Sequence, residues 1–180
     1  MRTRIEAGRH FSKLRTRFAR TGSVICLLLI FAGHEVAPAL ADDIPATDDL
    51  ARLGQASRQL GIPAVVFVSR DACPYCRTLR DDILLPMQRA DKFDDRAILV
   101  EISLDRAGPI TGFDGSPTTA QAFGEHYRAQ ITPTLLFLDP EGNEISRRIV
   151  GISNLELYGH YLQKSIDTAL EAIRSGSPEG

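Results

Sequence analysis

The segment AVVFVSRDACPYC, residues 64–76, joins an unbroken apolar run to two closely spaced cysteines. Ala64–Val68 is rich in β-branched residues, which is typical of a strand buried on both faces. Pro74 suits the first turn of a helix, because the N–H that it lacks would have no partner there. We therefore expect a buried strand followed by a helix from Cys73 to about Leu85, which Pro86 should end or kink.

Helix patterns lie on both sides of this segment. Asp48 or Asp49 can cap a helix that ends at Gly61, and Ser116-Pro117 is expected to open a second one. Ser153-x-x-Glu156 has the spacing of a capping box and predicts the start of a last helix. The apolar positions that recur at helical spacing in these helices are Leu50, Leu53, Ala56 and Leu60; Ala120, Phe123 and Tyr127; and Leu155, Tyr158, Leu162, Ile166, Ala169 and Ile173.

Three further strands are predicted. Ala97–Leu104 alternates so that Ile98, Val100, Ile102 and Leu104 share one face. Thr134–Leu138 and Glu144–Val150 flank the turn-rich residues 139–143, which favours an antiparallel hairpin. The expected order is helix, strand, helix, strand, helix, strand, strand, helix, as in one compact α/β domain.

The first 41 residues differ in character from the rest. They hold seven basic and two acidic residues, then nine apolar residues at Val24–Ala32, and they end in Ala39-Leu40-Ala41. This order predicts a signal peptide cleaved after Ala41, an exported protein, and a single domain over residues 42–180. The apolar run is shorter than the roughly 20 residues that span a bilayer. An organellar transit peptide and an uncleaved anchor are the alternatives, and Cys26 would be removed with the leader.

Composition and charge exclude several classes of protein. With 43% hydrophobic and 24% charged residues, the chain is neither disordered nor collagenous. Its three cysteines are too few for a disulfide framework. Residues 42–180 carry 14 basic and 21 acidic residues, a net charge of −7. Nucleic acid is therefore not an expected partner, because phosphate binding needs a basic surface.

The paired cysteines indicate redox chemistry. A cysteine at a helix N-terminus gains stabilisation of its thiolate, the form that attacks disulfides. Cys73 has that position and should be the nucleophile, while Cys76, one turn further in, should resolve the mixed disulfide. Arg77 is a candidate for favouring the thiolate, with Arg70 as a second, although solvated surface arginines are an equal alternative for each. The pair would need no dissociable cofactor.

A metal site is the rival interpretation of the same two thiols. Closed zinc sites take four ligands, often from a second Cys-x-x-Cys or a pair of histidines. After the leader the chain offers only His126 and His160, and their positions in the helix patterns predict that both lie on the surface. A metal or iron–sulfur carrier is kept as the alternative function.

Taken together, Cys73-Pro74-Tyr75-Cys76 at a strand-to-helix junction, Thr132-Pro133-Thr134 entering the third strand and the order of elements resemble the thioredoxin superfamily. The resemblance covers about residues 47–173 and is strongest to exported periplasmic members of the SoxW and Dsb-related group. It implies a thioredoxin fold, with a central mixed four-stranded sheet flanked by helices and an extra N-terminal helix. It also implies a cis Thr132–Pro133 bond beside the cysteines.

The resemblance further implies the function and the binding residues. We expect a thiol-disulfide oxidoreductase that acts on protein thiols and disulfides with a redox partner protein. Pro74, Tyr75, Thr132 and Pro133 should contact the substrate, the backbone of Thr132 pairing with an extended segment. A monomer is expected, since no separate dimerisation domain precedes the fold as it does in dimeric isomerases.

The sequence departs from ordinary thioredoxins in the residues around the pair. Ala72 stands where thioredoxins have Trp, and Val65–Val68 is apolar where they bury an acid, so the proton of Cys76 must be handled elsewhere. The segment 105–115 is also longer than the roughly 2 to 6 residues usual for a strand-to-helix connection. Phe113 within it is either an exposed anchor for a partner or, more commonly, tucked onto the core.

Overall fold

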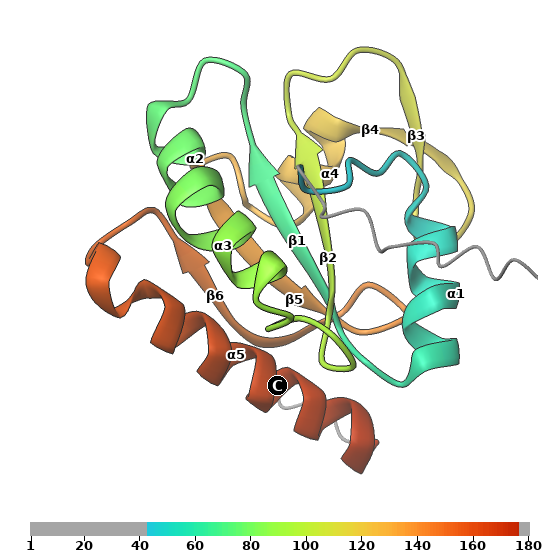
Figure 1. Ribbon diagram of the computed structural model, residues 1–180. Helices are drawn as coiled ribbons and strands as arrows, with labels where there is room; N and C mark the ends of the chain where they lie inside the picture. The colour runs from blue at the N-terminus through green and yellow to red at the C-terminus, as the bar shows by residue number, and fades with distance from the viewer. Residues whose placement is uncertain (1–42, 177–180) are drawn as a thin grey trace, which may run out of the picture. The chain divides into compact units, whose positions relative to one another are not determined.

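The computed structural model describes residues 43–176, so the predicted signal peptide and its cleavage site after Ala41 lie outside the described residues. No helix in the described part is long and apolar enough to cross a membrane. Along the chain the elements are α1 (Leu50–Leu60), β1 (Ala64–Ser69), α2 (Pro74–Leu79), the π-helical turn η1 (Arg80–Leu84), α3 (Leu85–Arg89), β2 (Ile98–Ser103), β3 (Pro109–Thr111), β4 (Pro117–Thr119), α4 (Ala120–His126), β5 (Thr134–Leu138), β6 (Glu144–Val150) and α5 (Leu155–Ser175) (Figure 1).

The main sheet has four strands in the order β2-β1-β5-β6. β1 pairs with β2 in parallel and with β5 antiparallel, and β5 pairs with β6 antiparallel, so the sheet is mixed. Every residue of β1 and β5 is buried. One face packs against α2, α3 and α5, and the other against α1 and α4 (Figure 1). This is the architecture expected from the sequence, including the helix before the first strand.

The two edges of this sheet differ. Residues 43–49 run along β2, where Glu101 donates its N–H to Pro45 and accepts the N–H of Thr47, and Ala46 forms a parallel bridge with Glu101. At the opposite edge, β6 pairs only with β5 within the described chain. One edge is therefore partly covered and the other is open.

Helix α1 has the predicted ends but a different buried face. Asp49 accepts the N–H of Arg52 at 2.8 Å, and Gly61 closes the helix with a φ of 65°. The buried residues are Leu50, Leu53, Gly54 and Ser57. The prediction for Leu60 was wrong, since it is 64% exposed, and Ala56 is only half-buried. The chain turns back after Gly61, and Ile62, whose carbonyl accepts the Ser57 hydroxyl, is buried instead.

The helix that begins after Cys73 does not end at Pro86. It continues through η1, where the N–H of Leu85 donates to Arg80, five residues back, and α3 then runs to Arg89. A proline interrupts the i to i−4 ladder, and a π turn is one way in which a helix accommodates such an interruption. The prediction of a helix end near residue 85 was therefore wrong.

The segment 105–119 forms structure that the sequence did not reveal. β3 and β4 pair as a small antiparallel hairpin, so Ser116-Pro117 enters a strand and does not open a helix. Thr119 caps α4 by accepting the N–H of Ala122 at 3.1 Å. Phe113 packs onto the core beneath α1 and α4, which is the commoner of its two predicted placements.

Helix α5 carries the middle of the predicted apolar stripe, with Tyr158, Leu162, Ile166 and Ala169 buried against the sheet. The prediction for Leu155 was wrong, since it lies in the first turn of the helix and is 38% exposed, and Ile173 is only partly buried. Its cap lies one residue later than predicted, because Asn154 accepts the N–H of Leu157 at 3.1 Å in place of a Ser153 capping box. The strand predictions are also confirmed: Val100, Ile102 and Leu104 of the β2 region share one core with Ile98 packed against it.

Candidate active site

Cys73 and Cys76 form a disulfide with a Cα–Cα distance of 5.2 Å. Cys73 is the N-cap of α2, and its Sγ accepts the backbone N–H of Cys76 at 3.1 Å. The two sulfurs differ in access, since Cys73 is 8% exposed and Cys76 only 1%. After reduction, the helix N-terminus would hold a Cys73 thiolate next to free N–H groups, and a partner would reach that sulfur first.

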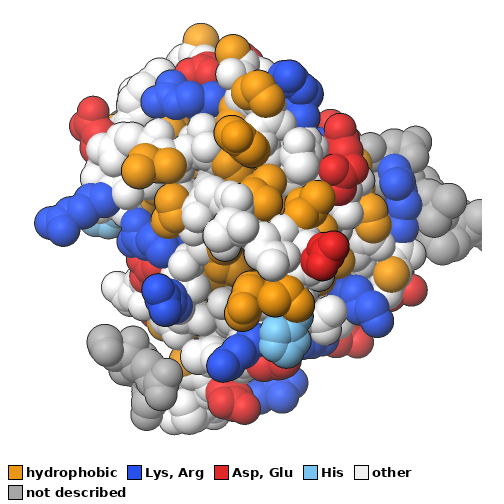
Figure 2. All heavy atoms as spheres, turned by 90° about the vertical axis from the view of Figure 1, so that its left-hand side faces the viewer, with side chains coloured by type: hydrophobic (Ala, Val, Ile, Leu, Met, Phe, Trp, Pro, Cys, Tyr) orange, Lys and Arg blue, Asp and Glu red, His pale blue; other side chains and the backbone are white. Residues whose placement is uncertain are grey.

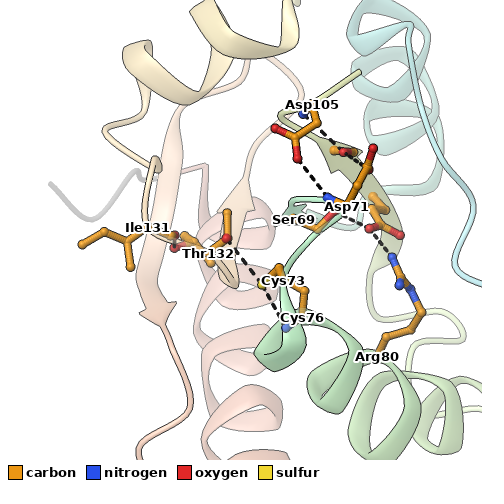
Figure 3. Close-up of a disulfide and its surroundings, with 11 residues drawn as sticks. Ser69, Asp71, Cys73, Cys76, Arg80, Asp105, Ile131 and Thr132 are labelled. Carbon is orange, nitrogen blue, oxygen red and sulfur yellow. Dashed lines mark hydrogen bonds and ion pairs between the residues drawn. A yellow bond between two sulfur atoms is a disulfide. The ribbon is translucent and has the colours of Figure 1, made fainter. Parts of the chain in front are cut away.

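The loop before β5 lies against the disulfide. The Thr132–Pro133 bond is cis, as the resemblance implied. The Thr132 hydroxyl donates to Cys73 Sγ at 3.5 Å, while Ile131 points away from the disulfide (Figure 3). Pro133 is buried, and its carbonyl accepts the N–H of Gly151 at 2.8 Å. Within residues 43–176 the backbone of Thr132 has no hydrogen-bond partner, so it can pair with an extended chain.

The two candidate arginines are in different situations. Arg70 forms an ion pair with Asp105 at 2.7 Å, so its charge is already compensated and it is a poor candidate for stabilising a thiolate. Arg77 is exposed and has no acidic partner within residues 43–176. Asp105 also accepts the N–H of Asp71 at 3.0 Å, which fastens the segment that leads into Cys73 (Figure 3).

Sequence reasoning missed a buried charge beneath the active-site helix. Glu101 on β2 lies opposite Phe67 on β1 and is 8% exposed. Its carboxylate accepts hydrogen bonds from the Ser69 hydroxyl and from the guanidinium of Arg80, four residues after Cys76. Arg80 also lies over the Phe67 ring, 5.5 Å from its centroid. In the sequence, Glu101 looks like the solvent side of an alternating strand. Only the tertiary structure shows that Arg80, at the start of η1, lies against that side.

Apolar side chains are exposed around the disulfide. Tyr75, between the two cysteines, is 66% exposed, and Ile131, next to Thr132, is 69% exposed. Val150 pairs opposite Thr134 at the end of β6 and is 48% exposed. Figure 2 shows hydrophobic side chains gathered across the middle of the face that carries the start of α2 and the connection from β6 to α5. Such a surface suits contact with another protein.

The histidines do not join the cysteines. His126 and His160 are both exposed, as predicted. Among residues 43–176, no group of three His, Cys, Asp or Glu side chains is placed to hold a metal ion.

Comparison with known proteins identifies the family. The sequence model of the thioredoxin-like domain matches residues 54–166, which is more than half of the chain. The chain belongs to the thioredoxin-like domain family. A search of curated protein sequences finds no match.

Solved structures similar to this thioredoxin-like domain include two thioredoxins and one oxidoreductase. Thioredoxin O2 from Arabidopsis thaliana in the oxidised state has 16% identity and a TM-score of 0.47, over 68% of this chain and 93% of that one. Thioredoxin NaTrxh from Nicotiana alata has 18% identity and a TM-score of 0.47, over 69% and 96%. The oxidoreductase DsbH has 18% identity and a TM-score of 0.49, over 78% and 95%.

Family and site agree on the chemistry. A thioredoxin-like domain with two cysteines at disulfide distance, at the start of a helix and beside a cis-proline, is a thiol-disulfide oxidoreductase. The redox group is the cysteine pair itself, which alternates between a disulfide and two thiols.

Proposed function

We propose that this protein is an exported, periplasmic oxidoreductase that exchanges disulfides with other proteins, Cys73 attacking and Cys76 resolving. The observation that carries the assignment of roles is the difference between the sulfurs. Cys73 is the more exposed, caps the helix and accepts an N–H, whereas Cys76 is almost completely buried. No dissociable cofactor is required.

The exchange proceeds through a mixed disulfide. In the reducing direction, the Cys73 thiolate attacks one sulfur of a substrate disulfide and forms a new S–S bond, and the other substrate sulfur leaves as a thiolate that takes a proton from solvent. Cys76 then loses its proton and attacks Cys73 Sγ, which releases the second substrate sulfur and forms the Cys73–Cys76 disulfide. Two electrons pass to the substrate, and the reverse sequence oxidises a substrate dithiol.

The proposed substrates are protein segments in an extended conformation. The free backbone of Thr132 offers a donor and an acceptor next to Cys73, and Pro74 and Pro133 border the same site. The exposed side chains of Tyr75 and Ile131 supply apolar contact on either side. Arg77 adds a positive charge one residue after Cys76 that no acidic side chain of residues 43–176 pairs with, and there it would favour thiolates over thiols.

Exchanging each cysteine in turn tests the mechanism. Cys73→Ser is expected to abolish disulfide exchange, because the attacking sulfur is gone. Cys76→Ser is its matched control and should accumulate mixed disulfides with substrate proteins, visible by mass spectrometry as adducts on Cys73. Normal turnover by the Cys73→Ser protein would overturn the proposal. The reduction potential of the pair gives the direction, from about −270 mV for a reductant to about −120 mV for an oxidant.

Export is supported by the basic, apolar and Ala-x-Ala order of the first 41 residues. N-terminal sequencing of protein from the periplasmic fraction should find Asp42 as the first residue. A chain that retains residues 1–41, or that stays in the cytoplasm, would contradict this part of the proposal and leave the exchange chemistry in place.

A further inference from the structure

The open edge of the main sheet borders a groove. β6 pairs with β5 on one side, and within the described chain no strand pairs with its other side. Between β6 and α5 lies a groove of about 850 Å³. Its lining consists of all seven residues of β6 together with Tyr161, Lys164, Ser165 and Thr168 of α5. An unpaired strand edge in such a groove offers backbone groups to another chain.

The groove runs along the whole of β6 and along part of α5. Seven strand residues extend over about 24 Å at the usual rise of a strand. α5 lines the same groove from Tyr161 to Thr168, and the Ser165 hydroxyl donates to the carbonyl of Arg147 at 3.4 Å, which fixes the helix beside the strand. An occupant that follows this lining is an extended chain, because a compact ligand would contact only part of it.

The charge of the groove is positive. Arg147 and Lys164 are exposed, and neither has an acidic partner among residues 43–176. Glu144 is the acid in the lining, and Arg148 already holds it in an ion pair. Asp167, the acid nearest to Lys164 on α5, is bound by Arg96. Two uncompensated cations therefore line this groove on a chain whose residues 42–180 carry a net charge of −7.

The charges of Arg147 and Lys164 favour an acidic segment over a second copy of this chain as the occupant of the groove. A second copy that added its own β6 antiparallel to this one would bring Arg147 of both copies close together, and like charges facing each other across strands are destabilising. An acidic segment would instead place its carboxylates against Arg147 and Lys164. Hydrogen bonds between such charged groups are among the stronger ones in proteins.

We propose that this groove binds an acidic, extended segment of a partner protein, which adds to β6 as a further strand. The groove leads to the active site, because Val150 at its end pairs opposite Thr134, and the next residue, Gly151, donates its N–H to Pro133. The Val150 end of the groove is therefore joined through Pro133 and Thr132 to the loop that contacts Cys73, so a partner held along β6 reaches towards the disulfide from that end. The role of this partner in disulfide exchange rests on the proposed function, whereas the binding of the partner to the groove does not.

The test uses the oxidised protein over residues 42–180 and a cysteine-free peptide, so that binding is measured without exchange. The probe is the acetylated octapeptide Thr-Glu-Val-Glu-Thr-Glu-Val-Glu. Amide chemical shifts in NMR should move in β6 and in residues 161–168. The double variant Arg147→Glu/Lys164→Glu should weaken binding by about ten-fold or more, because it reverses both of the exposed positive charges that would contact the carboxylates of the peptide.

Matched controls separate strand addition from general attraction of charge. Arg52→Glu/Arg89→Glu makes the same charge change at two exposed arginines on α1 and α3 that also lack an acidic partner in the described chain, and it should leave the affinity within about two-fold. The same peptide N-methylated at alternate residues keeps its carboxylates but loses backbone donors, and it should bind about ten-fold more weakly.

Three results would overturn the proposal: shifts located elsewhere than β6 and residues 161–168, no shifts at all, or equal binding of the N-methylated peptide. The rate of exchange with a small-molecule disulfide is measured in parallel. Both double variants should retain it, so a loss of peptide binding with unchanged exchange concerns the groove alone. An inactive protein that still binds the peptide would instead contradict the proposed function.

Discussion

At the scale of single residues, Cys73 and Cys76 have the same side chain but differ in solvent access because they occupy different positions in the helix. Cys73 caps a helix and keeps some contact with solvent, whereas Cys76 is one turn further in and is almost fully buried. That difference follows from a spacing of three residues at a helix start, so it was predictable from the sequence. The buried pair of Glu101 and Arg80 was not predictable, because the two residues are 21 positions apart and come from different elements.

Glu101 is expected to matter for stability through its partner. Glu101→Ala leaves the guanidinium of Arg80, which is 25% exposed, without its main acceptor. Because the partly buried guanidinium would keep only the exposed carboxylate of Asp43 at 3.7 Å, we expect a loss of about 3 kcal/mol in the free energy of unfolding, measured by urea denaturation. The control is Arg58→Ala, which breaks a pair with Glu141 in which both side chains are 58% exposed and should cost less than about 1 kcal/mol. Equal losses would refute the distinction.

The raised pKa of Tyr127 predicts that the stability of the protein depends on pH. Burial and the charges of Asp139 and Glu144 raise the pKa of Tyr127 to about 12, and its hydroxyl donates to Gly142 at 2.6 Å. An unfolded chain ionises tyrosine near pH 10, so the stability from this group is present below pH 10 and is lost as the pH rises towards 12. Tyr127→Phe should cost about 1 kcal/mol at pH 7 and make this decline shallower. Burial also raises the pKa of Tyr158, so part of the decline remains. The measurement is the free energy of unfolding, taken from urea denaturation at several pH values between 10 and 12. If this free energy falls with pH as steeply in Tyr127→Phe as in the unchanged protein, the assignment is wrong.

At the scale of elements, the interiors of helices and strands were predictable from the local sequence pattern, whereas their ends depended on tertiary contacts. β1 and β5 agree with the sequence patterns because they are unbroken apolar runs that are buried on both faces, and the middle of α5 agrees because its burial repeats every three to four residues. The end of the helix after Cys73, the start of α4 and the cap of α5 were misplaced. A π turn at residues 80–84 lets the helix after Cys73 continue past Pro86. Strand pairing at Pro117 delays the start of α4, and the side chain of Asn154 caps α5 in place of Ser153.

The turn between β5 and β6 is tied to the hairpin of β3 and β4, and two glycines test this tie. Gly142 has a φ of 86°, and an added Cβ would lie 2.5 Å from the Phe113 ring. Gly108 has a similar φ of 88°, but a Cβ there would meet nothing within 4 Å. Gly108→Ala should cost about 1 to 2 kcal/mol from backbone strain alone. Gly142→Ala should cost about 1 to 3 kcal/mol more from overpacking. Thermal unfolding measures both, and equal shifts would show that Phe113 is not held against this turn.

At the scale of the whole molecule, charge opposes self-association. Residues 42–180 carry a net charge of −7, and the open edge of the sheet carries Arg147 at its centre. Charged residues on an edge strand discourage pairing with a second copy. We therefore predict that the oxidised protein over residues 42–180 is a monomer in solution, with a sedimentation mass of one chain at all concentrations. A mass that rises towards two chains with concentration would contradict this.

The sequence by itself determined the order of the four strands of the main sheet, the buried strand before Cys73 and the redox pair, because each depends on neighbours within a few positions along the chain. The tertiary structure alone decided that Glu101 is buried against Arg80, that Arg70 is neutralised by Asp105, and that β6 and α5 line a cationic groove. These features join residues that lie far apart in the chain. Periodicity reports which face of an element is apolar, whereas the charge and access of a polar side chain depend on what packs over it.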